Sequence, residues 1–211
     1  MASEVGICNA ALQLIKHSKE ITDLAQGTKE ANACEKIYVE LRDSLLSMHN
    51  WNFAIKRVKM SRIASSDSRA PVFGWLYGYE FPADHLRKVT VHDNSDGRGI
   101  FPHKLEANQV NTDAENVYLR YVHRVVDPNL MTPLFRLALS KLIASRLAVA
   151  LAQSTTLSKE MYTQFTDEDL PTAKSADSLQ DTPDQMPESS WVSVRHGGSL
   201  ENEVTSIVGV D

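Results

Sequence analysis

Residues 47–57, SMHNWNFAIKR, mark the point at which the sequence changes from one periodicity to another. Before this stretch, apolar residues recur every three or four positions, which predicts amphipathic helices; after it, apolar and basic residues alternate, which predicts a strand. Two large aromatic side chains, Trp51 and Phe53, stand at the change. They form either a catalytic wall beside His49 and Asn50 or an aromatic plug that fastens a helical layer to a sheet.

Two helices are predicted before this stretch. Ser3 is a suitable N-cap for a first helix that ends near Lys16, and Thr28 is a suitable N-cap for a second. The second helix keeps one apolar stripe for about five turns, with charged residues on its opposite face. The stripe comprises Ala31, Cys34, Ile37, Tyr38, Leu41, Leu45 and Met48.

A small antiparallel sheet of about four or five strands is predicted next, because short alternating segments are separated by turn-forming residues. The expected strands are AIKRVKMSRI (54–63), 74–81, 86–93, 104–110 and 116–125. Alternation from Phe73 to Phe81 would place all the aromatic residues of that segment on one face. We therefore expect Trp75 and Tyr77 to join Trp51 and Phe53 in the plug; a second interpretation places some of these aromatics at a subunit interface.

Helical periodicity returns after Asp127-Pro128. Pro133 suits the first turn of a strongly apolar, alanine-rich helix that runs to about Ser154. A further helix is predicted from Leu157 to Thr166 or beyond, and Pro171 either kinks it or starts a new piece that runs through Gln180. The fold class is therefore α+β: a bundle of about four helices (3–50 and 129–180), an inserted β domain (51–128) and an extended C-terminal arm (181–211).

Composition narrows the classes of function. The chain has 211 residues, 42% of them hydrophobic and 23% charged, which suits a packed domain, and no apolar run is long enough to span a bilayer. The N-terminus lacks the features of a signal peptide, so we expect a protein that is made in a cytoplasm and does not bind membranes. The net charge of −5 is concentrated after residue 156, which disfavours a simple nucleic-acid-binding protein.

No motif predicts catalysis, a metal site or a cofactor. The seven histidines have no HExxH spacing, and the two cysteines, Cys8 and Cys34, fall on apolar helix faces. The strongest candidates for catalysis are paired carboxylates, such as Glu80 and Asp84, which a glycosidase would use. Capping and turn formation explain this pair better, so we expect no enzyme.

Five segments, in their order along residues 3–180, carry a resemblance to the head-to-tail adaptors of short-tailed phages, the tail tubular protein A family. The aromatic turn WNFA with its basic strand is the most recognisable, and FPADHL matches the family's aromatic–Pro–x–Asp–x–Leu step into a strand. The chain departs from the family in its first turn, which lacks the usual glycine, and after residue 181. The segments are LIKHSKEIT (14–22), ACEKIYVELRDSLLSMHNWNFAIKR (33–57), GWLYGYEFPADHLRKV (74–89), VYLRYV (117–122) and PLFRLALSKLIASRLAVALAQS (133–154).

The resemblance implies a structural virion protein, assembled in the host cytoplasm, that forms a ring of twelve copies between the portal protein and the tail nozzle protein. Tail fibres are a further candidate partner. Genomic DNA would pass through the ring without specific binding. Twelve copies would carry about −60 charges, and an acidic or neutral channel avoids trapping phosphates. The resemblance implies no enzyme; a virion-associated peptidoglycan hydrolase that uses paired carboxylates is the alternative.

The arm is expected to dock on the portal, because its apolar residues cannot form a core alone and would be buried only against a partner. The candidates are Trp191, Val192, Val194, Val204, Ile207 and Val208.

Overall fold

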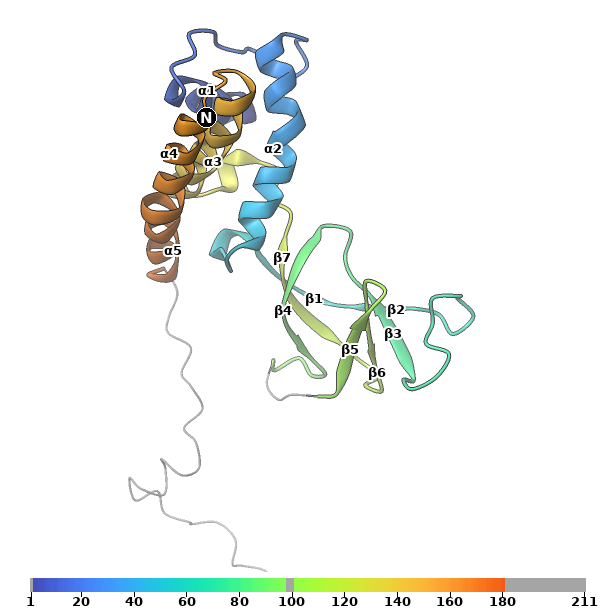
Figure 1. The fold of residues 1–211 in the computed structure, drawn as a ribbon. Helices are drawn as coiled ribbons and strands as arrows, with labels where there is room; N and C mark the ends of the chain where they lie inside the picture. The colour runs from blue at the N-terminus through green and yellow to red at the C-terminus, as the bar shows by residue number, and fades with distance from the viewer. Residues whose placement is uncertain (1, 98–100, 181–211) are drawn as a thin grey trace, which may run out of the picture. The chain divides into compact units, whose positions relative to one another are not determined.

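Four helical rods and seven strands make up residues 2–97 and 101–180, the part of the chain that the computed structural model describes (Figure 1). The helices come from the two ends of this part and the strands from its middle, so the predicted α+β class is confirmed. The predicted arm, 181–211, lies outside the described residues.

The first two helices begin where the sequence predicts. Helix α1 (Glu4–Leu14) is capped by Ser3 and helix α2 (Lys29–Ser47) by Thr28, and each hydroxyl accepts a hydrogen bond from the backbone N–H three residues on. Helix α1 ends earlier than predicted, because the backbone turns into the left-handed region at Lys16.

Three further helical segments follow the strands. Helix α3 (Pro133–Ala150) is separate, whereas α4 (Thr155–Gln164) continues through a π-helical turn, Phe165–Asp169, into α5 (Leu170–Ser178). Pro171 has no N–H to donate to the preceding turn, and the helix widens just before it instead of breaking. The π turn contains one residue more than an α-helical turn would, so it sets which face of α5 is buried.

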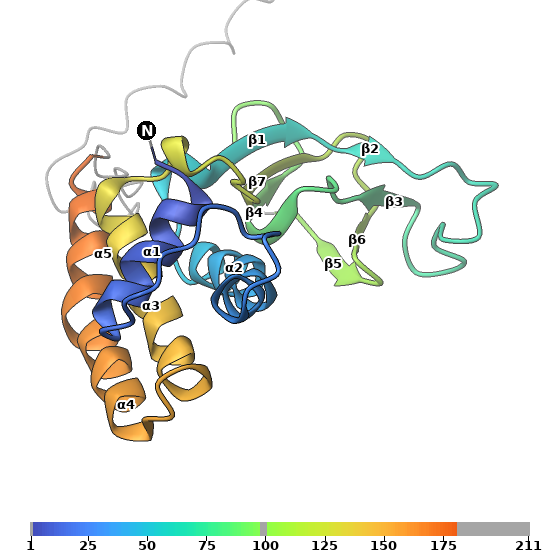
Figure 2. The ribbon, with the colours of Figure 1, turned by 90° about the horizontal axis from the view of Figure 1, so that it is seen from above.

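Helix α3 is the centre of the helical part, since it packs against α1, α2, α4 and α5. Figure 2 shows it between α2 and the rod formed by α4 and α5. Because neighbours surround it, even its serines are buried; Ser140 and Ser145 each donate a 2.7 Å hydrogen bond to a carbonyl of the same helix. The alanine-rich sequence allows this close packing within the chain.

The strands form two antiparallel sheets, so the single predicted sheet is wrong. One sheet has the order β1-β7-β4 and the other the order β2-β3-β6-β5. Their bounds are β1 (Ile55–Lys59), β2 (Ser61–Arg62), β3 (Tyr77–Glu80), β4 (His85–His92), β5 (His103–Glu106), β6 (Gln109–Thr112) and β7 (Tyr118–His123).

Two local features divide the predicted strands. Met60 separates β1 from β2, and its side chain is buried in the core between the sheets. The segment predicted as one strand at 104–110 is a hairpin, because Ala107 and Asn108 both have positive φ, 46° and 60°. Two consecutive residues with positive φ reverse the chain in a tight turn.

Two hydrophobic cores follow from this arrangement. The helical core extends onto the first sheet, where it includes Val122 of β7 and contacts Ile55 of β1. The second core lies between the sheets, since it takes Tyr79 and Val110 from one and Leu119 from the other. Strand β7 is therefore buried on both faces and joins the two cores.

Within the described residues, each helix is too short or too polar to cross a membrane.

The hairpin turn provides a test of this fold. A left-handed conformation costs a residue with a Cβ roughly 1–2 kcal/mol, and glycine loses about 0.5–1 kcal/mol through unfolded-chain entropy, so Ala107→Gly should stabilise the protein by about 0.5 kcal/mol. Ala107→Val should instead destabilise it, because a β-branched residue suits positive φ least. Urea unfolding measures both changes. If a strand instead ran continuously through Ala107, Ala107→Val would be the more stable of the two variants and Ala107→Gly the less stable.

Candidate assembly surfaces

The aromatic junction between helix and sheet centres on Trp51, which is fully buried. Its indole N–H donates a 3.0 Å hydrogen bond to the carbonyl of Leu45 in the last turn of α2. Its ring packs edge to face against the ring of Phe135 in α3, with centroids 5.0 Å apart. The Phe53 ring also packs against Phe135, with centroids 5.1 Å apart. These contacts hold the chain against α3 where it leaves α2 and enters β1.

The polar residues of the same stretch support this junction. His49 lies edge-on to Trp51, and its Nε2 is 3.6 Å from the buried carboxylate of Asp177 in α5. Burial lowers the pKa of His49 although the Asp177 charge opposes this shift. The backbone N–H of Asn52 also donates to Asp177, and Asn50 accepts a 2.6 Å hydrogen bond from Arg87 of β4. The side chains thus tie the end of α2 to α5 and to the first sheet, which is a structural role.

The predicted plug of four aromatics is wrong for two of its members. Trp75 belongs to neither core, and Tyr77 packs against the core between the sheets. The reason is Gly74, whose φ of +80° interrupts the extended chain, so the alternation expected from Phe73 onward begins only at Tyr77.

Sequence reasoning missed Phe135 as a member of the junction. Phe135 is fully buried, whereas Leu137, two residues further along α3, is exposed. Phe135 belongs to a set of apolar residues spaced by three and four, which also includes residues 138, 139 and 142. That spacing identifies a buried face, but it does not identify Trp51 as the contact.

The two carboxylates considered for catalysis have cationic partners. Asp84 accepts a 2.8 Å hydrogen bond from Lys56 and a 2.9 Å bond from Tyr121. Burial favours its neutral form, but these bonds and the Lys56 charge outweigh burial and hold the pKa of Asp84 below its ordinary value. Burial and the bond to Asp84 raise the pKa of Tyr121 to about 12. Glu80 forms a 2.8 Å ion pair with Arg69.

The segment between β2 and β3, residues 63–76, is a loop whose two ends are held by polar contacts. Arg69 pairs with Asp67 at 2.9 Å and with Glu80 of β3, and its carbonyl accepts a hydrogen bond from the buried Gln109 of β6. At the other end, the Leu76 N–H donates to a carboxylate oxygen that lies just after β6. Several polar contacts therefore hold the loop against the second sheet.

This loop presents apolar side chains to solvent. Val72 is 93% exposed, Phe73 89% and Leu76 71%. We call these three residues the apolar tip. In Figure 1 the loop extends beyond β2 and β3. Exposed apolar residues that cluster on a well-held loop are typical of a protein-binding site.

The six predicted portal-docking residues, Trp191, Val192, Val194, Val204, Ile207 and Val208, lie outside the described residues. Among the residues at 2–97 and 101–180, no group of three or more His, Cys, Asp or Glu side chains could hold a metal ion. Cys8 and Cys34 are buried free cysteines.

No protein-family model matches this chain, and no curated protein matches it significantly.

The junction makes a prediction about stability. Trp51→Ala removes a buried ring and leaves a cavity beside Phe135, so it should lower the free energy of unfolding by about 3–5 kcal/mol. Trp75→Ala is the matched control and should cost less than about 1 kcal/mol, because Trp75 lies in neither core. Chemical denaturation followed by circular dichroism measures both. Equal losses for the two variants would contradict the role given to Trp51.

The Asp84 contacts predict a dependence on pH. Because the pKa of Asp84 is lower in the folded state, its carboxylate stabilises the protein above the ordinary aspartate pKa of about 3.9, and this contribution disappears as pH falls through the folded-state pKa. Wild type should therefore exceed Asp84→Asn in stability at pH 7, with the difference shrinking in acid. Thermal unfolding from about pH 7 down to about pH 2.5 tests this; a difference that grows in acid would contradict it.

Proposed function

We propose that this chain is a structural virion protein, the head-to-tail adaptor of a short-tailed phage. Copies of it form a ring, twelve by resemblance, that joins the portal to the tail nozzle and lines the channel through which DNA leaves. Residues 181–211 reach the portal, and tail fibres are a further candidate partner. The order of the five sequence segments that resemble tail tubular protein A supports the family assignment.

The observation that carries a role in assembly is the apolar tip. Val72, Phe73 and Leu76 together expose a large apolar surface, while ion pairs and hydrogen bonds hold the loop beneath them. A loop that is ordered before binding loses little conformational entropy when it docks, so such a site favours protein–protein contact.

Exposed apolar side chains on the helices support the same role. They lie on α2 and directly after it, on α3 and on α4, and neighbouring subunits on several sides would cover them. These residues are Val39, Met48, Leu137, Val149 and Tyr162.

The chemistry of the carboxylates supports a role other than hydrolysis. A hydrolase of the glycosidase type needs one carboxylic acid with a raised pKa to protonate the leaving group. Asp84 has the opposite shift, and Glu80 is engaged by Arg69 on the exposed side of its strand. The pair thus stabilises the sheets and the base of the loop.

Assembly on the portal tests the proposal. Phe73→Asp should leave the fold unchanged, because its side chain is exposed, but should lower ring formation at least about tenfold, because a carboxylate would be desolvated in the contact. Ser66→Asp adds the same charge to an exposed position of the same loop and serves as the control. Sedimentation velocity and electron microscopy, with the portal protein of the same genome, measure the ring.

Two results would overturn the proposal. One is a wild-type chain that stays monomeric with the portal present; release of soluble fragments from peptidoglycan by that chain would then favour the hydrolase. The other is a ring that forms equally well with Phe73→Asp and Ser66→Asp, which would remove the observation on which the proposal depends.

A further inference from the structure

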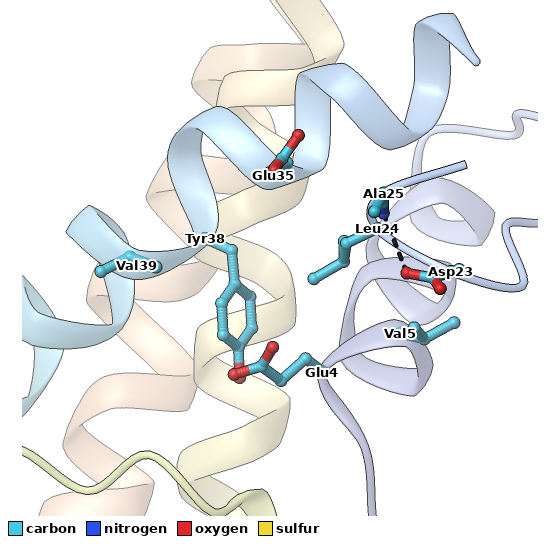
Figure 3. Close-up of a pocket in the computed structure, with 8 residues that line it drawn as sticks. All are labelled: Glu4, Val5, Asp23, Leu24, Ala25, Glu35, Tyr38 and Val39. Atoms are coloured by element: carbon cyan, nitrogen blue, oxygen red, sulfur yellow. Dashed lines mark hydrogen bonds between the residues drawn. The ribbon is translucent and has the colours of Figure 1, made fainter. Parts of the chain in front are cut away.

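A hollow of about 340 Å³ lies where the start of α1, the connector before α2 and the middle of α2 meet (Figure 3). Leu24 and Val39 contribute apolar surface to its lining. Three carboxylates also line it, from Glu4 of α1, Asp23 of the connector and Glu35 of α2. Both acidic and apolar side chains therefore line the hollow.

Among the described residues, few groups neutralise these three carboxylates. Glu4 is 3.8 Å from Arg42, but that guanidinium is closer to Asp43, at 2.9 Å. Asp23 accepts a hydrogen bond from the backbone two residues on, and Glu35 forms no ion pair within the described part of the chain. The hollow thus carries an excess of negative charge that favours a cation.

A buried hydroxyl provides a second, independent indication of a ligand. Tyr38 lines the hollow with only 1% of its surface exposed, and its hydroxyl has no hydrogen-bond partner among the described residues. Figure 3 shows the ring reaching from α2 toward the Glu4 carboxylate. Buried hydroxyls without a partner are uncommon and destabilise a folded chain, so this one points to a group that is supplied from outside.

The same chain carries basic residues with the complementary charge. Strands β1 and β2 are each at the edge of a sheet, and together they expose Lys56, Arg57, Lys59 and Arg62. Lys56 is paired with Asp84 within the chain, whereas Arg57 has no ion pair within the described residues. We call these four residues the basic edge.

We propose that the acidic hollow of one copy receives a basic side chain, Arg57, from the basic edge of a second copy. The guanidinium would lie among Glu4, Asp23 and Glu35, and its N–H groups would supply the hydrogen bond that the Tyr38 hydroxyl lacks. Arginine suits this site because its planar fork serves several acceptors at once. The inference rests on the proposed ring.

The contact has the symmetry that a ring requires. The hollow and the basic edge are different surfaces of one chain, so each copy uses one surface toward each of its two neighbours. Such head-to-tail contacts close into rings when the rotation between copies divides the circle, whereas a contact between identical surfaces would stop at a dimer.

Charge reversal tests the contact on full-length chains. Glu35→Lys and Arg57→Glu should each weaken self-association at least about tenfold, because each places like charges together. An equimolar mixture of the two variants should recover association. Arg57 of the Glu35→Lys variant can enter the unchanged hollow of the other variant, and the new glutamate at position 57 can meet the new lysine in the hollow of the first. Glu40→Lys on α2 and Lys159→Glu on α4 are matched controls, because both residues are exposed outside the two surfaces. Sedimentation velocity, with and without portal protein, measures association.

Tyr38→Phe separates assembly from folding. Removing a hydroxyl that lacks a partner should leave the melting temperature of the monomer unchanged or raise it, whereas the same variant should weaken association several-fold. A hydroxyl that only stabilises the single chain would give a lower melting temperature and unchanged association.

The outcomes distinguish this inference from the adaptor proposal. A wild-type ring that tolerates Glu35→Lys and Arg57→Glu overturns the contact and leaves the adaptor proposal standing. Association that fails to recover in the mixture of variants also overturns the contact. A wild-type chain that remains monomeric with portal protein present overturns both.

Discussion

The burial of Trp51 against Phe135 is the contact on which the arrangement of helices and strands depends. The chain must leave α2, turn and enter β1, and a turn normally leaves the last helical carbonyls without partners. The Trp51 indole donates to one of the last carbonyls, that of Leu45, which also accepts the Met48 N–H, while its ring fills the space beside α3. Trp51 therefore contributes to the end of α2, to the helical core and to the path of the chain into β1. Polar contacts of His49, Asn50 and Asn52 fix the same path.

Sequence patterns predicted the elements that local chemistry determines. Ser3 and Thr28 were recognisable as caps because a helix start needs a side-chain acceptor, and Trp51 stood out because the periodicity changes around it. Phe135 could not be assigned to Trp51, since a contact between distant positions leaves no periodic signal. The two sheets were missed for a different reason: the alternation continues through Met60, where β1 of one sheet passes into β2 of the other. The hairpin was missed because positive φ at Ala107 and Asn108 reverses the chain within an alternating segment.

Several polar residues in the described part of the chain hold segments together. Buried Arg42 links α1 to α2 through Glu4 and Asp43, and Asp43 in turn binds Arg124 beyond β7. Arg69 does the same for the loop that carries the apolar tip. Because Arg42 is buried, removing one of its carboxylate partners leaves its charge less well satisfied, so this network restricts the geometry even where it adds little net stability.

The π-helical turn at Phe165–Asp169 makes α5 sensitive to the number of residues before it. Each residue inserted into a helix rotates the remainder of that helix by about 100°. Asp177, which receives the Asn52 N–H, lies beyond the widened turn, so the extra residue of that turn enters the rotation that brings Asp177 to the junction. Related chains should therefore keep the length of this segment fixed even where its exposed side chains vary, and a one-residue deletion within it should be rarer than substitutions.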